Sequence, residues 1–122
     1  MSSTPKMMTV AATSFYEKQA RALLEEGERD GILNFLSDHP EAGDLIRGTG
    51  GLRKLRWALP GRGKSGGVRV IYYFYNEEIP LWLLSVFSKN EQENLTEEQK
   101  RLLSGIVEAI KRAAKEARER GR

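Results

Sequence analysis

The chain has 122 residues, no cysteine, a single histidine and a formal net charge of +3. This length suits one domain with its own core, and the lack of cysteine excludes a disulfide framework and a thiolate metal site. The first nine residues are polar and the longest apolar run, residues 81–84, is too short to cross a bilayer. We therefore expect a cytoplasmic protein with no membrane partner, folded as a single domain over residues 1–122 with a charged C-terminal helix extension at about 112–122.

Positive charge is concentrated in the middle of the chain. Residues 45–76 hold seven basic residues and no acidic one, whereas residues 1–44 and 77–99 are net acidic. A solvated surface usually mixes charges of both signs, so a purely basic block indicates an anionic partner. We interpret that partner as RNA.

The first part of the chain predicts a strand and two helices. Residues 7–12 form a short apolar run suited to a strand. Ser14 and Glu17 fit a capping box and open the first helix. A second helix follows at about 28–37, and Pro40 closes it because the residue before a proline is pushed out of helical geometry.

His39 is the only histidine, and it stands beside this proline. A histidine in such a place is more often a surface or capping residue than a catalyst, and its near-neutral pKa is the only argument for catalysis. A single histidine also excludes a histidine-rich metal site, and no pair of carboxylates occurs in a cleft-like context. We expect neither a metal nor a cofactor.

Two strands joined by a glycine-rich loop carry most of the basic block. In the first, residues 52–59, side chains alternate so that the apolar residues face the core and Lys54 and Arg56 share the opposite, open face. In the second, residues 68–75, Arg69 joins them if the apolar set of that strand faces the helices. The basic residues of both strands then form one surface.

The rest of the chain predicts a third strand and a long helix. Residues 79–88 are apolar on both faces, which is typical of an interior strand, and strict alternation puts Val86 on the face of Leu84. Thr96 and Gln99 fit a second capping box. Apolar residues then repeat at helical spacing, so this helix docks on the rest of the protein.

The loop between the two basic strands, residues 61–66, reads GRGKSG and satisfies the bare pattern G-x-G-x-x-G. Phosphate-binding loops of this kind need a strand before them and a helix after them, and here a strand follows. The longer phosphate-loop pattern also needs a glycine where Ala58 stands. We interpret the segment as a basic hairpin loop, and expect Arg62 and Lys64 to contact RNA.

An enzyme with this composition has to work with arginine, lysine, tyrosine and backbone groups. Such groups suit phosphodiester transfer, because they hold the scissile phosphate, stabilise charge on its oxygens and protonate the leaving 5′ oxygen. The 2′-hydroxyl of the RNA serves as the nucleophile, so no metal is required. Aromatic side chains beside them add stacking for unpaired bases.

The order of these elements resembles the RelE/ParE superfamily toxins of bacterial type II toxin–antitoxin systems, above all the HigB-like branch. The resemblance rests on residues 43–46, 48–56, 61–67, 69–74 and 89–91. It implies an α+β fold, in which a small antiparallel-dominated sheet has two N-terminal helices packed on one face and is followed by a C-terminal helix. It also implies a ribosome-dependent mRNA endoribonuclease (an mRNA interferase). The partners implied are the ribosome, mRNA and a cognate antitoxin of the helix-turn-helix, HigA-like kind.

The resemblance also implies site residues. The catalytic positions of the family fall on Lys54, Arg56, Arg69 and Lys89. The chain departs from the family pattern at two positions. Asn90 stands where related toxins have an arginine, and this chain has no tyrosine near its C-terminus. Tyr73 therefore becomes the candidate for proton transfer. Contacts to RNA or the ribosome are expected from Arg53, Arg62, Lys64, Phe87 and Asn90.

Two other functions remain open on the same fold. One is a ParE-like inhibitor of DNA gyrase without nuclease activity, which would cause DNA damage rather than translation arrest. The other is a catalytically degenerate toxin fold that only binds a partner.

Overall fold

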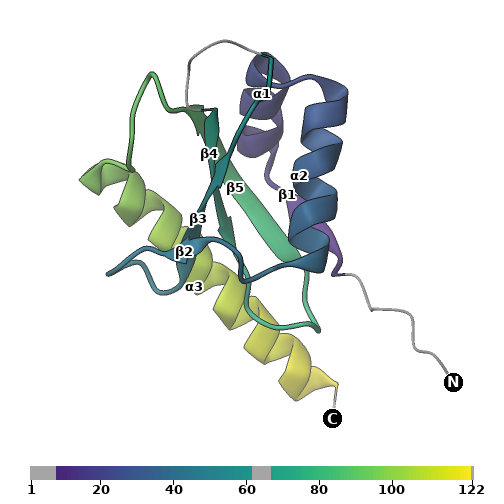
Figure 1. Ribbon diagram of the computed structural model, residues 1–122. Coiled ribbons are helices and arrows are strands. Elements are labelled where there is room, and N and C mark those ends of the chain that lie inside the picture. The colour runs from purple at the N-terminus through teal and green to yellow at the C-terminus, as the bar shows by residue number, and fades with distance from the viewer. Residues whose placement is uncertain (1–7, 62–66, 122) are drawn as a thin grey trace, which may run out of the picture.

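The computed structural model describes residues 8–61 and 67–121 (Figure 1). Within these residues five strands and three helices form an α+β fold, as predicted. In chain order they are β1 (Val10–Ala12), α1 (Ser14–Leu23), α2 (Glu26–Asp38), β2 (Asp44–Leu45), β3 (Leu52–Trp57), β4 (Val68–Tyr73), β5 (Leu81–Ser88) and α3 (Glu97–Arg120).

The strands form one sheet in the order β1-β5-β4-β3-β2. Only β1 and β5 run parallel, and the other three pairs are antiparallel. This confirms an antiparallel-dominated sheet with β5 in its interior. The short strand β2 is not among the predicted strands: Asp44 pairs with Lys54 and Leu45 with Arg53 at the edge of the sheet.

Helices cover both faces of the sheet. Figure 1 shows α1 and α2 together on one side and α3 crossing the other. Each side has its own apolar cluster, the first around Tyr72 and Leu83 and the second around Ile71 and Val107. The predicted packing of two N-terminal helices on one face is confirmed. None of the helices in the described part of the chain is both long enough and apolar enough to span a membrane.

Helix starts follow capping chemistry, with one shift from the prediction. The cap of α1 is Thr13 rather than Ser14, since its hydroxyl oxygen accepts a hydrogen bond from Tyr16 N at 3.1 Å. The box of Thr96 and Gln99 at the start of α3 is confirmed. The last three turns of α3 are mostly exposed, and Figure 1 shows them continuing beyond the sheet.

A β-bulge interrupts the alternation of β5. Its register on β4 jumps from Ile71↔Ser85 to Tyr72↔Leu83, so Leu84 is an extra residue. A bulge of one residue exchanges the faces of all side chains beyond it. Val86 therefore packs under α1 and α2 with Leu83, and its predicted place beside Leu84 is wrong.

Candidate nucleic-acid interface

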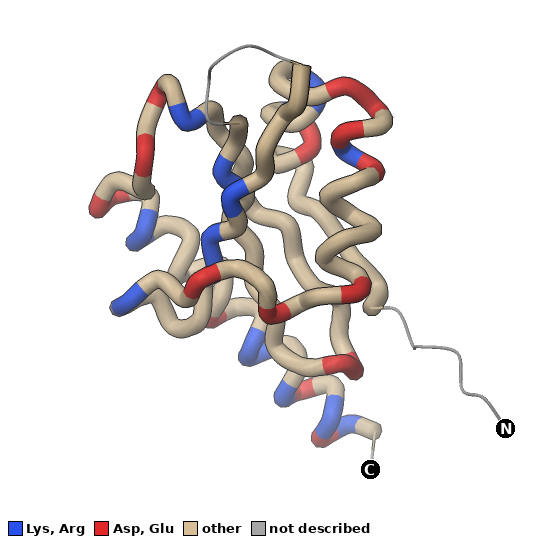
Figure 2. The backbone as a smooth tube through the Cα atoms, in the orientation of Figure 1, with Lys and Arg blue, Asp and Glu red and all other residues tan. Residues whose placement is uncertain are grey.

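Three basic side chains lie together on the α3 side of the sheet, and we call them the basic row: Lys54, Arg56 and Arg69. Lys54 and Arg56 are two residues apart on β3, and Arg69 lies directly opposite Arg56 on β4. Figure 2 shows lysine and arginine positions (blue) close together near the middle of the molecule. Like charges directly opposite one another on a sheet are destabilising, so the row requires counter-charges or an anionic ligand.

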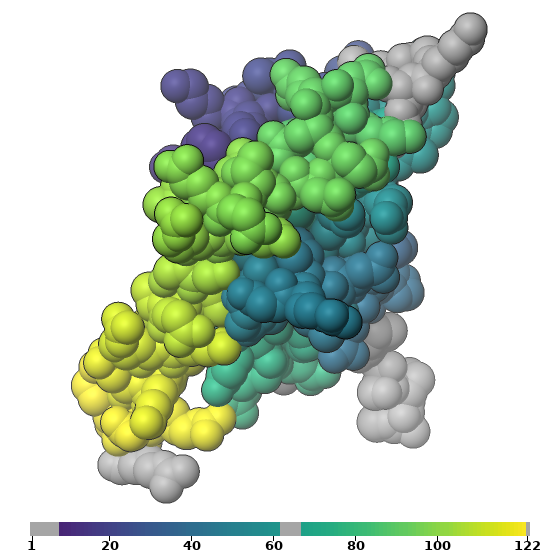
Figure 3. Space-filling view, turned by 90° about the vertical axis from the view of Figure 1, so that its left-hand side faces the viewer, coloured from purple at the N-terminus to yellow at the C-terminus, as the bar shows by residue number. Residues whose placement is uncertain are grey.

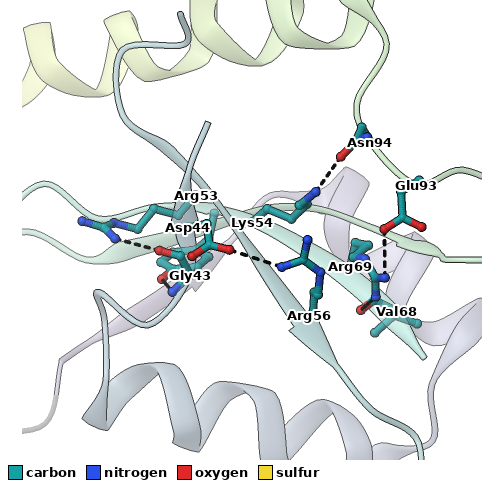
Figure 4. A network of polar contacts seen from close by, with 10 residues as sticks. Gly43, Asp44, Arg53, Lys54, Arg56, Val68, Arg69, Glu93 and Asn94 are labelled. Atoms are coloured by element: carbon teal, nitrogen blue, oxygen red, sulfur yellow. Dashed lines mark hydrogen bonds and ion pairs between the residues drawn. The ribbon is translucent and has the colours of Figure 1, made fainter. Parts of the chain in front are cut away.

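The chain supplies a polar partner for each member of the basic row (Figure 4). Arg69 Nη2 donates to Glu93 Oε2 at 3.1 Å, and Arg56 Nη1 donates to Asp44 Oδ2 at 3.2 Å. Lys54 Nζ donates to Asn94 Oδ1 at 2.5 Å. Two of the three partners are neighbours in the connection between β5 and α3, which we call the 89–96 segment.

The row passes from a covered to an open environment. The Arg69 side chain is only 5% exposed, whereas that of Arg56 is 57% exposed. A groove of about 300 Å³ opens beside Lys54 and Arg56. Its wall is completed by residues of β2, the residue after it, the 89–96 segment and α3, namely Asp44, Leu45, Ile46, Asn94, Leu95 and Lys100.

Burial, a hydrogen bond and neighbouring charges change two pKa values at the basic row. Burial, followed by the charges of Arg56 and Arg69, lowers the pKa of the Lys54 ammonium from its usual 10.5. The hydrogen bond from Arg69, with the nearby charges of Lys89 and Lys54, lowers the pKa of the Glu93 carboxyl from its usual 4.5. Lys54 therefore gives up a proton more readily than an isolated lysine does, and Glu93 stays ionised at neutral pH.

Tyr73 does not lie with the basic row. It pairs with Leu52 at the other end of the β3–β4 ladder from Arg56 and Arg69, and it is 3% exposed in the cluster under α3. Burial raises its pKa to about 12. A buried phenol with a raised pKa is a poor acceptor for a proton at neutral pH, so the position gives no support to the expected role in proton transfer.

The other candidates at the end of β5 divide into buried and exposed residues. Phe87 lies opposite Arg69 and is 5% exposed within the α3 cluster, which leaves little ring surface for stacking on a base. Lys89 and Asn90 are exposed where the chain leaves the sheet. The structure thus places Lys89 and Asn90 at the rim of the basic row and a buried Phe87 beside Arg69 on the neighbouring strand.

Arg53 lies on the opposite face of β3 from the basic row, and it holds the backbone that leads into β2. Its Nη1 donates to the carbonyl oxygens of Glu41 and Gly43 at 3.0 and 2.7 Å. The hydroxyl of Tyr72 binds the same stretch, since it donates to Pro40 O and accepts from Gly43 N, both at 2.8 Å. These bonds fix residues 40–43, which lead into β2, and Asp44 of β2 in turn pairs with Arg56.

The remaining predictions lie elsewhere. Arg62 and Lys64 fall outside the described residues. His39 ends α2 and its ring packs on Phe35, with 4.9 Å between ring centroids, as a capping residue would. Within the described part of the chain no group of three or more histidine, aspartate or glutamate side chains is placed to hold a metal ion.

Sequence reasoning missed the partners of the row and the groove's lysine: Asp44, Glu93, Asn94 and Lys100. Lys54 and Asn94 are 40 residues apart, and no local pattern connects them. The only signal in the sequence was indirect, since the acidic segment that follows β5 has a charge opposite to that of the basic block.

Comparison with known proteins agrees with this architecture. A family model described as "RelE toxin of RelE / RelB toxin-antitoxin system" matches residues 41–120, more than half of the chain. A solved structure of E. coli toxin RelE, a double arginine-to-alanine mutant in the free state, matches with a TM-score of 0.52 and 21% sequence identity. That match covers 71% of this chain and 88% of the E. coli chain, and at this identity it concerns the fold. The chain belongs to the RelE toxin family of toxin–antitoxin systems.

Proposed function

We propose that this toxin is an mRNA interferase of the HigB-like branch, which cuts mRNA on the ribosome in the cytoplasm without a metal ion. The observation that carries the proposal is the basic row beside an open groove. Three cations within one cross-strand neighbourhood suit a phosphodiester, whose charge increases on the phosphoryl oxygens during cleavage. A cognate antitoxin of the helix-turn-helix, HigA-like kind would neutralise the toxin.

In the proposed reaction the RNA supplies its own nucleophile. The 2′-hydroxyl gives its proton to water as its oxygen attacks the adjacent phosphorus, the bond from phosphorus to the 5′-oxygen breaks, and a 2′,3′-cyclic phosphate and a 5′-hydroxyl result. Arg56 and Arg69 stabilise the charge on the phosphoryl oxygens. Lys54 gives its proton to the leaving 5′-oxygen, a role that its lowered pKa favours.

Binding along the RNA needs more cations than the basic row. Lys89 at the rim and Lys100 across the groove extend the positive surface, and Asn90 beside Lys89 adds a neutral hydrogen-bonding group. We propose that these residues hold the flanking nucleotides, and that Arg62 and Lys64 contact ribosomal RNA. Each phosphate contact of this type adds affinity that salt weakens.

Induced expression with a measurement of translation and mRNA cleavage tests the proposal. We expect Lys54→Ala and Arg56→Ala to reduce cleavage on ribosomes by about 10²-fold or more, the usual scale for loss of one group that stabilises the transition state. Arg112→Ala, which removes an exposed arginine of α3 far along the helix, is the matched control and should remain toxic. Arrest without mRNA cleavage, or DNA damage before arrest, would contradict the assignment and favour gyrase inhibition.

A further inference from the structure

Glu93 occupies the position on Arg69 that the proposed reaction assigns to a phosphate. A carboxylate and a phosphate present the same pair of acceptor oxygens to a guanidinium group, and both form strong charge-assisted hydrogen bonds with it. The bond of 3.1 Å from Arg69 Nη2 to Glu93 Oε2 is therefore a contact of the kind that a substrate would make.

The carboxylate lies on the outer side of the guanidinium. The Arg69 side chain is 5% exposed, whereas that of Glu93 is 49% exposed. Figure 4 shows the carboxylate directed at Arg69 from the 89–96 segment, and Asn94 of the same segment directed at Lys54. A ligand that approaches Arg69 from solvent consequently meets Glu93 first.

The 89–96 segment is fixed on either side of these two residues. At one end, Glu91 N and Gln92 N donate to Ser88 O at 3.0 and 3.2 Å. At the other end, Leu95 is 7% exposed in the cluster beneath α3. Figure 3 shows the segment (green) and the β2 region (blue) beside each other on the surface, where they border the groove. The Glu93 side chain can therefore rotate away from Arg69 while both anchors stay intact.

We propose that Glu93 is an internal competitor for the phosphate, which occupies Arg69 in the free toxin and is displaced by the scissile group of the substrate. The inference rests on the proposed function and adds a way in which cleavage at that site is regulated. When an isolated RNA binds, its phosphate replaces the Glu93 carboxylate on Arg69, so the net gain in binding free energy is small. RNA held in place by further contacts presents its phosphate at a high effective concentration and displaces the carboxylate. The competitor therefore makes cleavage depend on a ribosome that positions the mRNA.

The experiment compares two variants of the full chain that lose the same charge from the same segment. Glu93→Gln keeps the shape of the side chain and removes the negative charge that contacts Arg69. Glu91→Gln removes an exposed charge that makes no described side-chain contact with the row. Affinity is measured with a short single-stranded RNA whose 2′-hydroxyls are methylated, so that it binds without being cut. Cleavage of the unmodified RNA is measured without ribosomes.

We expect Glu93→Gln to bind the methylated RNA about tenfold more tightly than the wild type, the scale of one charge-assisted contact. It should also cut free RNA that the wild type and Glu91→Gln leave intact. Equal tightening in both variants would mean a general charge effect and would overturn the proposal, as would unchanged affinity. Loss of ribosomal cleavage by Glu93→Gln at unchanged affinity would also overturn it, because the carboxylate would then take part in the reaction.

The same assays separate this inference from the function on which it depends. If Lys54→Ala and Arg56→Ala lose cleavage on ribosomes while Glu93→Gln behaves as the wild type, the basic row remains the site and only the competitor is rejected. If Lys54→Ala and Arg56→Ala keep full cleavage, the site assignment and the competitor both fail.

Discussion

The two halves of the α3 side of the sheet use the same two strands in opposite ways. At one end of the β3–β4 ladder Leu52 and Tyr73 are almost completely buried, in a cluster with Leu103 and Val107 of α3. At the other end the paired residues are Arg56 and Arg69, and the polar 89–96 segment takes the place of the helix. We call these the covered half and the polar half.

The difference shows what side-chain alternation does and does not determine. Alternation assigns a residue to a face of the sheet, because successive side chains point to opposite sides. Whether that part of the face is dry or open to a ligand depends on the element that crosses it. Here α3 buries the covered half and borders the groove of the polar half only through Lys100, so the polar half remains available for charge.

The largest loss of stability is expected in the covered half, where two leucines that are neighbours on α3 can be compared. Leu103 is 8% exposed and Leu102 is 65% exposed. We expect Leu103→Ala to lower the free energy of unfolding by about 2–4 kcal/mol, because it leaves a cavity against the sheet. Leu102→Ala should change it by less than about 0.5 kcal/mol. Urea denaturation measures both, and equal losses would show that α3 docks through another face.

The next test is at the edge of the covered half, where a glycine touches Tyr73. Gly51 has φ +128°, and a Cβ placed there would lie 2.9 Å from Tyr73 Cε1. We expect Gly51→Ala to cost about 2–3 kcal/mol through backbone strain and overpacking. Gly48 has φ +78° with open space around it, so Gly48→Ala should cost only about 1 kcal/mol of strain. Thermal unfolding of the two variants separates the contribution of the contact from that of the backbone.

A smaller effect is expected from pH in the polar half. Because the folded state lowers the Glu93 pKa, its contribution to stability is fully present above the ordinary value of 4.5 and is lost as the pH falls through the lowered value. Glu93→Gln should therefore weaken the dependence of the urea midpoint on pH in the acid range. Glu91→Gln should retain it, and an unchanged slope in both would contradict the ion pair with Arg69.

The smallest stability effect is expected from Arg56, although its effect on cleavage is large. Its side chain and that of Asp44 are 57% and 75% exposed, and exposed ion pairs contribute little to stability. We expect Arg56→Ala to change the free energy of unfolding by less than about 0.5 kcal/mol. A large loss in thermal unfolding would mean that the polar half is held together by its charges rather than by the sheet.

The sequence was sufficient to predict the fold class and the membership of the basic row. Helical periodicity and the cap at Thr96 predicted α3, and alternation placed Lys54, Arg56 and Arg69 on one face. Local patterns contain no information on contacts between distant segments, so Glu93 and Asn94 were not predicted as partners of the row. Tyr73 was named for proton transfer because the chain has no tyrosine near its C-terminus, and no local pattern showed that α3 covers it.

The extra residue in β5 shifts the alternation of side chains by one, so the residues on either side of it face the two helical layers in opposite order. Before Leu84, odd-numbered residues face α1 and α2, and beyond it Val86 does so. The reversal puts Phe87 on the α3 side of the sheet, opposite Arg69. Removal of one apolar residue at this point would alter the cover of the polar half without touching a single charge, so the length of β5 is as much a part of the site as the arginines are.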